Sequence, residues 1–193
     1  MQQQKSAGTK DRIADAFLSL AGHKAVNKIT VREIAESSGV TTVTFYNYFR
    51  DKYDLTVWIH VRAASEIMGK VGGGYEWRDA LLDGIRYFSE NRAFMLNALQ
   101  HTSGQDSFIR HIERVNTDLL TAEVRKSLGT KPVPPAVQYA IKVYTAGTVR
   151  AMFDYLMDDA PIPAEELAQI LEDCLPPVLR GFFIHHLYIS LKV

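Results

Sequence analysis

The chain has 193 residues, of which 47% are hydrophobic and 23% charged, a composition typical of a globular protein with a substantial core. It contains no apolar run long enough to span a bilayer and no apolar N-terminal stretch of the secretory type. The single cysteine, Cys174, excludes an internal disulfide, and the Cys and His residues do not have the spacing of a zinc site. We therefore expect a cytoplasmic protein with no metal site and no cofactor.

Charge is unevenly distributed, although the 22 Lys and Arg residues balance the 22 Asp and Glu residues. Residues 1–62 contain nine basic and six acidic side chains, a net charge of 9 − 6 = +3, so the remainder carries 13 − 16 = −3. A basic end on an acidic body suits a protein that turns one end toward phosphate groups. Chance asymmetry of a few charges is the alternative, so charge supports this interpretation without establishing it.

Apolar residues recur with a helical period along almost the whole chain, and no convincing alternating strand is present. The pattern predicts an all-α fold of about nine helices. In chain order they occupy residues 9–22, 30–37, 41–48, 51 to the glycines at 72–74, 77–90, 92–101, 104–128, 135–158 and 164–186. On the seventh, the predicted buried stripe consists of Phe108, Ile112, Val115, Leu119 and Ala122.

The segment from Ile29 carries the most informative pattern. Thr30 followed by Glu33 is a capping box, and Ile29 with Ile34 fits the hydrophobic staple around it. Gly39 then occupies a position where a sharp turn requires positive φ. With Thr41 as a second N-cap candidate, two short helices joined by a glycine turn are predicted, which is the helix-turn-helix arrangement.

The second of these helices has an apolar side and a polar side. Phe45 and Phe49 are predicted to enter the core, while the opposite side displays short hydroxyls, an amide and a tyrosine. Such groups hydrogen-bond base edges or phosphates, and a threonine or valine methyl contacts a thymine methyl. Lys52 begins the next helix, where it is placed for a phosphate contact. The predicted DNA-binding residues are Thr41, Thr42, Val43, Thr44, Tyr46, Asn47, Tyr48 and Lys52.

The last two predicted helices are apolar on more than one side. On 135–158, one stripe contains Val137 and Ile141, and a second stripe of small residues contains Val143 and Gly147. Pro176 and Pro177 are expected to bend the final helix. Helices that are apolar on two sides have two partners, so we expect a homodimer formed through these two helices. The alternative is a pair of central helices in a monomeric core.

The segment Phe45–Phe49 (FYNYF) followed by DKYDL at residues 51–55 resembles the DNA-binding domain of the TetR family of bacterial regulators. The resemblance implies a helix-turn-helix domain over residues 1–50 and a helical effector-sensing and dimerisation domain over residues 51–193. Two departures stand out: Val43 lies where glycine is frequent in that family, and Thr42 lies where lysine or arginine is frequent.

Residues 91–112 and 144–171 are similar to the C-terminal region of regulators related to the dihydroxyacetone kinase operon activator. The resemblance implies a sequence-specific regulator of transcription, with a repressor released by a signal at the C-terminal domain as the first expectation. An activator or co-regulator controlled by a protein partner is the alternative, and the signal is a small-molecule effector or a protein. No membrane partner is expected. An enzyme is not expected, because the phosphate-binding, dinucleotide-binding and H-E-x-x-H patterns are absent.

Overall fold

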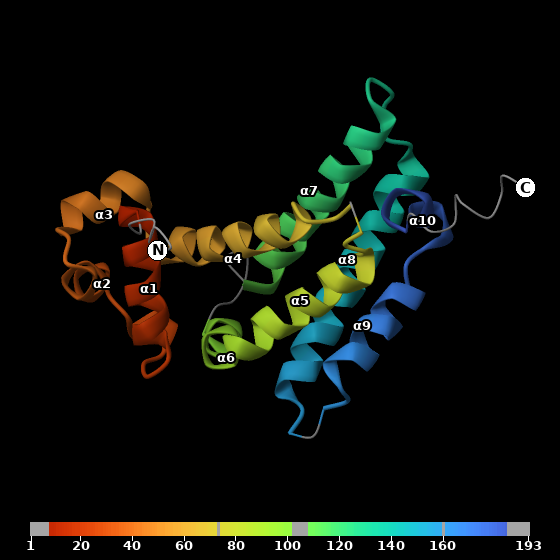
Figure 1. Ribbon diagram of the computed structural model, residues 1–193. Helices are drawn as coiled ribbons and strands as arrows, with labels where there is room; N and C mark the ends of the chain where they lie inside the picture. Colours follow the sequence, from red (N-terminus) through yellow and green to blue (C-terminus); the bar gives the residue numbers. More distant parts are fainter. Residues whose placement is uncertain (1–7, 73, 102–107, 160, 185–193) are drawn as a thin grey trace, which may run out of the picture. The chain divides into compact units, whose positions relative to one another are not determined.

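A computed structural model describes residues 8–72, 74–101, 108–159 and 161–184, and this part of the chain is helical, as predicted (Figure 1). It contains ten α-helices, one 3₁₀ helix and no named strand. The elements are α1 (Thr9–Ala21), η1 (Val26–Lys28), α2 (Val31–Ser38), α3 (Thr42–Tyr48), α4 (Lys52–Met68), α5 (Trp77–Glu90), α6 (Arg92–Gln100), α7 (Phe108–Leu128), α8 (Pro135–Met157), α9 (Ala164–Asp173) and α10 (Pro177–Phe183).

The predicted final helix is two helices rather than one bent helix. Helix α9 ends at Asp173, and α10 begins at Pro177 with Pro176 as its N-cap residue. Proline has no N–H to donate and its ring clashes with the preceding turn, whereas it fits the first turn of a new helix. Residues 185–186 of that predicted helix, and residues 104–107 of the predicted helix at 104–128, lie outside the described residues.

Helix α7 buries a different side than predicted over its second half. Phe108, Ile112 and Val115 are buried as expected, but Leu119 is half-buried and Ala122 is exposed. The buried residues there are Leu120 and Val124. Leu119 and Leu120 are adjacent apolar residues that point to different sides of the helix. The elements packed against α7 determine which of the two side chains is buried.

The chain forms two compact units. One comprises Met1–His60 with Ala93–Phe108, and the other comprises Val61–Arg92 with Ile109–Val193. In the first unit, the Phe17 and Phe94 rings meet edge to face with centroids 5.8 Å apart, so α6 shares a core with the N-terminal helices. The domain boundary after residue 50 remains a prediction.

Asn97 of α6 binds the loop between α1 and η1. Its Nδ2 donates to the carbonyl oxygens of Ala21 and Lys24, each at 2.7 Å, and its Oδ1 accepts from the Val26 N–H at 2.8 Å. One side chain thereby satisfies three backbone groups that lie more than 70 positions away in the sequence. These bonds hold the end of α1 and the approach to α2 against α6.

We expect Asn97→Ala to lower the free energy of unfolding by about 1–3 kcal/mol, because partly buried backbone groups lose their partners. Urea denaturation measures the change, and amide hydrogen exchange at Val26 should accelerate with it. Gln100→Ala on the exposed side of the same helix is the control and should change little. Equal stability of the two variants would contradict this role.

In the second unit a buried polar chain crosses the core. The Trp77 Nε1–H donates to the Tyr144 hydroxyl at 3.1 Å, and that hydroxyl donates to the Leu171 carbonyl at 2.9 Å. Burial raises the pKa of Tyr144 to about 12, so it remains a neutral donor. Helices α5, α8 and α9 are joined by these two bonds, and Phe183 of α10 packs on Trp77 with ring centroids 4.9 Å apart. Over the described part of the chain, no helix is both long and apolar enough to cross a membrane.

Candidate nucleic-acid interface

Helix α2 begins as predicted, with a capping box. The Thr30 hydroxyl accepts from the Glu33 N–H at 3.2 Å, and the Glu33 carboxylate accepts from the Thr30 N–H at 2.9 Å. At the other end Gly39 has φ 67° and ψ 34°, the left-handed conformation expected from its place in the turn. The Val40 N–H returns to the Ala35 carbonyl at 2.9 Å, which closes the helix end. These local bonds fix where α2 stops and α3 can start.

Helix α3 is anchored by its aromatic side. Phe45 is fully buried and Phe49 nearly so, with their ring centroids 5.7 Å apart. Phe49 also meets the Trp58 ring of α4 at 5.6 Å. At the N-terminus of α3, the Thr41 hydroxyl accepts from the Thr44 N–H at 3.0 Å, the predicted cap. The orientation of α3 about its own axis is therefore set by Phe45 and Phe49.

The opposite side of α3 lies open within its unit. Val43 is 69% exposed, Tyr46 58% and Tyr48 42%, and Thr42 and Asn47 are also exposed. These side chains lie opposite the packed side of the helix, where a partner from outside the unit can reach them. The structure thus brings five of the predicted residues onto the accessible surface of one helix. It contains no nucleic acid, so their contacts with bases remain a prediction.

Thr41 and Thr44 have a local role. Their hydroxyl oxygens lie 2.9 Å apart, so the two side chains hydrogen-bond one another in addition to capping α3. Thr41 is exposed and Thr44 is half-buried. Both hydroxyls therefore maintain the helix start, and a DNA contact by either one remains a prediction.

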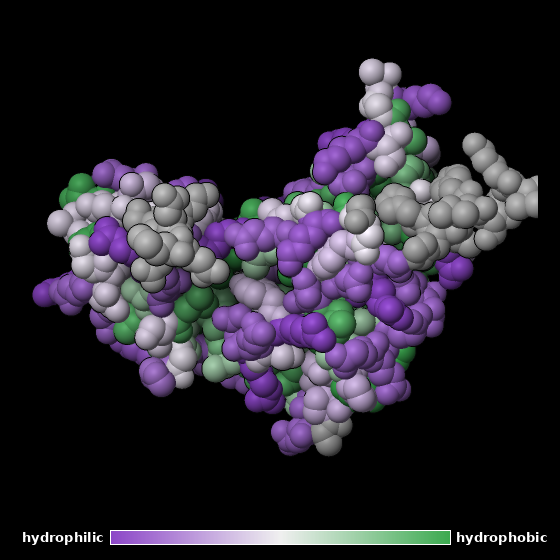
Figure 2. Space-filling view, in the orientation of Figure 1, coloured by the Kyte–Doolittle hydropathy of each residue, from purple (hydrophilic) through white to green (hydrophobic). Residues whose placement is uncertain are grey.

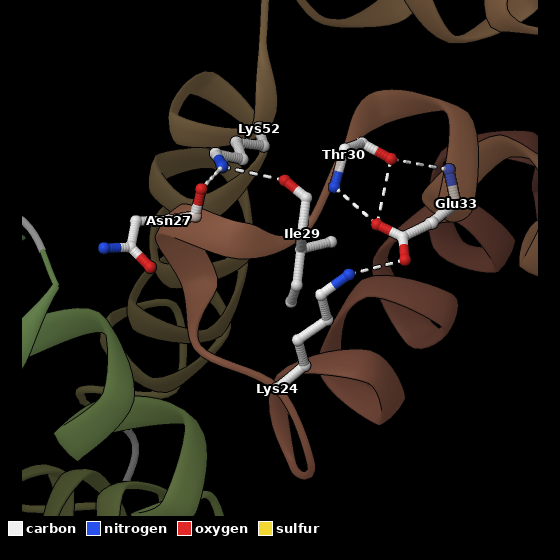
Figure 3. A network of polar contacts seen from close by, with 6 residues as sticks. All are labelled: Lys24, Asn27, Ile29, Thr30, Glu33 and Lys52. Carbon is white, nitrogen blue, oxygen red and sulfur yellow. Dashed lines mark hydrogen bonds and ion pairs between the residues drawn. The ribbon is translucent and has the colours of Figure 1, made fainter.

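Lys52 is held in a network that Figure 3 shows from close by. Its ammonium group donates to the carbonyl oxygens of Asn27 and Ile29 at 2.8 and 2.7 Å. Partial burial of the ammonium is the main cause of a lowered Lys52 pKa. Lys52 thereby ties the start of α4 to the segment that precedes α2. The Lys52 Nζ also lies 5.4 Å from the centroid of the Tyr53 ring. The phosphate contact of Lys52 remains a prediction.

Glu33 connects the same network to Lys24, in the loop between α1 and η1. Its Oε1 lies 2.6 Å from the Lys24 Nζ, and Oε2 accepts from Thr30 (Figure 3). The bond from Lys24, followed by the bonds from Thr30, lowers the pKa of Glu33 to about 2. Because the folded pKa is below the ordinary value, the ionised Glu33 contributes stability above about pH 4.5, and that contribution is lost as the pH falls through about 2.

We expect Glu33→Gln to lower the melting temperature near neutral pH and to have a smaller effect at about pH 3, because the wild-type carboxylate is losing its advantage over that range. Thermal unfolding followed by circular dichroism at both pH values measures the difference. Glu36→Gln is the matched control, since Glu36 is an exposed acid of α2 whose ion pair is with Arg32, four residues earlier on the same helix. A Glu33→Gln effect of the same size at both pH values would argue against this assignment.

Arg50 is a further candidate that the sequence interpretation did not include. It lies directly between α3 and α4, and its side chain is 87% exposed with a long 3.5 Å contact to Asp54. An accessible guanidinium beside the open side of α3 is suited to a phosphate contact. The signal that could have identified it is a basic residue immediately after the second helix of the pair.

Comparisons with known proteins agree with this geometry. A family model described as bacterial regulatory proteins, tetR family, matches residues 13–57, and one described as transcriptional regulator C-terminal region matches residues 75–176. The HTH-type dhaKLM operon transcriptional activator DhaS of Lactococcus lactis subsp. lactis (strain IL1403) is 33% identical over 94 residues, which are 49% of this chain. The match spans about half the length of that relative (50%).

Solved structures share the fold. The dihydroxyacetone kinase operon activator DhaS superposes with a TM-score of 0.64 at 21% identity, covering 91% of this chain and 98% of that one. A TetR transcriptional regulator from Rhodococcus sp. RHA1 superposes with a TM-score of 0.63 at 16% identity, covering 90% and 97%. The matched families and these neighbours are transcriptional regulators, not enzymes. The two family models together cover the helix-turn-helix and more than half of the chain, and the protein belongs to the TetR family of bacterial transcriptional regulators.

Proposed function

We propose that this regulator reads a two-fold operator as a homodimer, with the open side of α3 in the major groove. The observation that carries the proposal is the pair of large side chains, Val43 and Tyr46, left uncovered on a helix whose other side is anchored by Phe45 and Phe49. Burying Val43 and Tyr46 needs a partner surface. A recognition helix of this size fits the major groove of B-DNA.

The chemistry of the exposed residues suits base edges. The Asn47 amide has the donor and acceptor that pair with adenine, and Thr42 and Val43 present methyl groups for a thymine methyl. Tyr46 and Tyr48 each present a hydroxyl that donates or accepts a hydrogen bond. Arg50 and Lys52 flank this surface and supply the charge for backbone phosphates.

The second part of the proposal is dimerisation through α8 and α10, which pack against one another in the second unit. Tyr139 and Val143 of α8 are 69% and 70% exposed, Gly147 on the same side is exposed, and Val178 of α10 is 45% exposed. An apolar side of this kind favours burial against an identical surface related by a two-fold axis. The two recognition helices would then enter successive major grooves about 34–36 Å apart.

We expect Lys52→Ala to weaken binding to operator and to unrelated DNA alike, and to reduce the salt slope of binding by about one. It should also lower the melting temperature, because the Asn27 and Ile29 carbonyls lose their donor. Fluorescence anisotropy over a range of salt concentrations measures the first effect. Lys126→Ala in α7 is the control. An unchanged salt slope in the presence of a lowered melting temperature would assign Lys52 a purely structural role.

For the direction of regulation, a repressor released by a signal at the C-terminal half is the first candidate. An activator is the second candidate, because the DhaS relative is a transcriptional activator. The signal is proposed to be a small molecule or a protein partner. A solved neighbour, the transcriptional regulator FadR from Bacillus subtilis, was crystallised in complex with stearoyl-CoA, which is an example of the first kind.

The test is selection of genomic DNA fragments by the purified full-length protein. The expected result is a pseudopalindromic site whose half-sites are one helical turn apart. In vitro transcription from the neighbouring promoter then distinguishes a repressor from an activator. Enrichment of no common sequence would contradict the operator proposal, whatever the direction of regulation.

A further inference from the structure

Beside the turn between α7 and α8 lies an open surface pocket of about 590 Å³, formed entirely by residues of the second unit. Its walls come from the last turns of α7, the turn itself and the first turns of α8, at the top of Figure 1. Pockets that hold small organic ligands have volumes of about 300–1,000 Å³. We propose that this pocket binds a small molecule that carries a phosphate group.

Three cations line the pocket, each from a different part of the fold. Arg125 comes from α7, Lys131 from the turn and Lys142 from α8, against one acidic lining residue, Asp118. Neither Arg125 nor Lys131 makes a side-chain hydrogen bond or ion pair with any residue in the part of the chain that the structure describes. The Lys142 Nζ lies 5.4 Å from the centroid of the Tyr139 ring. Three positive charges against one acid give the lining a formal charge of about +2, which favours an anion.

The neighbouring Lys126 provides a comparison. Its Nζ lies 2.7 Å from the Glu123 carboxylate, so a cation in this last turn of α7 readily pairs with an acid of its own helix. Arg125, the adjacent residue, has no such pair among the described residues. A favourable interaction with the C-terminal dipole of α7 accounts for Arg125 and Lys126 equally. It does not account for Lys142, which lies on α8 beyond that dipole.

The pocket wall is built before any ligand arrives. Gly129 ends α7 with φ 62°, a conformation suited to glycine, and the Gln138 Nε2 donates to the Val133 carbonyl at 2.8 Å. The Thr121 hydroxyl is fixed to the Thr117 carbonyl at 2.7 Å. A preformed wall lowers the entropic cost of binding.

The two kinds of lining residue suit two parts of one ligand. The guanidinium of Arg125 can bind two phosphate oxygens at once. The ammonium groups of Lys131 and Lys142 can bind the third phosphate oxygen. Pro132 and Val133 offer apolar contact to an organic group. Figure 2 shows pale, purple and some green side chains around this turn, and no continuous apolar patch on the face in view.

The test uses the full-length protein without DNA, so its failure is separate from a failure of the operator proposal. Backbone amide spectra are recorded while ribose 5-phosphate is added at constant ionic strength, with ribose and sodium sulfate as parallel titrations. The expected result is saturable shifts at Gly129, Lys131 and Gln138 with ribose 5-phosphate, and none with ribose. The doubly substituted Arg125→Gln, Lys142→Gln protein should bind about tenfold more weakly or worse, because charge-assisted hydrogen bonds are lost.

Lys126→Gln is the matched control and should bind like the unaltered protein, since Lys126 lies outside the pocket. Lys131→Gln provides a second variant, at a position in the turn outside both helices. Saturable shifts of equal size with sulfate would mean an unselective anion surface and would overturn the proposal. Equal binding of ribose 5-phosphate by the unaltered protein and by all the variants would overturn it as well.

Discussion

Val143→Arg should convert the proposed dimer into folded monomers and weaken operator binding by about 100-fold or more. Val143 lies near the middle of the exposed apolar side of α8, where an arginine would be desolvated against the identical residue of a second copy. A monomer reaches one half-site at a time, so it loses the gain from simultaneous binding, which is typically about 10²–10⁴-fold. Sedimentation velocity measures the first effect and fluorescence anisotropy on the operator measures the second.

Ala122→Arg on the exposed side of α7 is the control for this experiment, because it introduces the same charge into another helix of the same unit. The circular dichroism of Val143→Arg should be unchanged, since Val143 is 70% exposed within the chain. A Val143→Arg protein that still sediments as a dimer would place the subunit contact elsewhere. A monomer that binds the operator with full affinity would reject the dimeric mode of recognition.

Tyr46→Ala is expected to weaken operator binding by about tenfold to a hundredfold, because a base-contacting side chain contributes about 1–3 kcal/mol. Binding to unrelated DNA should change much less, since that binding depends on phosphate contacts. The protein should remain folded and dimeric, although the edge contact between the Tyr46 and Phe45 rings, with centroids 5.6 Å apart, is lost. Anisotropy with operator and scrambled duplexes measures the two affinities.

Tyr46→Phe separates two possible contributions of this side chain. If the hydroxyl reads a base or a phosphate, the phenylalanine variant loses most of the affinity that the alanine variant loses. If the ring packs on a thymine methyl, the phenylalanine variant retains it. Full operator affinity in both variants would remove Tyr46 from the recognition surface.

Much of the site could be predicted because its determinants are local. The capping bonds of Thr30 with Glu33 and of Thr41 with Thr44 join residues three positions apart, and Gly39 signals its own turn through the φ it permits. The spacing of Phe45 and Phe49 then identifies which side of α3 is buried. These interactions join residues three or four positions apart, so the local sequence pattern predicts them.

The role of Lys52 could not be obtained in that way. Its carbonyl partners, Asn27 and Ile29, lie 25 and 23 positions earlier, and nothing in the local pattern pairs them. Similarly, Asn97 reads as a polar residue of an amphipathic helix until the fold brings it to Val26, 71 positions away. Contacts of this length depend on how the chain returns on itself, so a pattern search over neighbouring residues does not detect them.

The sequence by itself determined the all-α class, the starts and ends of α2 and α3, and the side of α3 that stays open. Each of these depends on hydrogen bonds and steric preferences within one or two helical turns. Only the tertiary structure decided that α6 shares a core with the N-terminal helices and that α7 buries Leu120 rather than Leu119. It also decided that one pocket is lined by Arg125, Lys131 and Lys142. Those outcomes depend on which helices pack against one another, and this is determined only when distant parts of the chain come together.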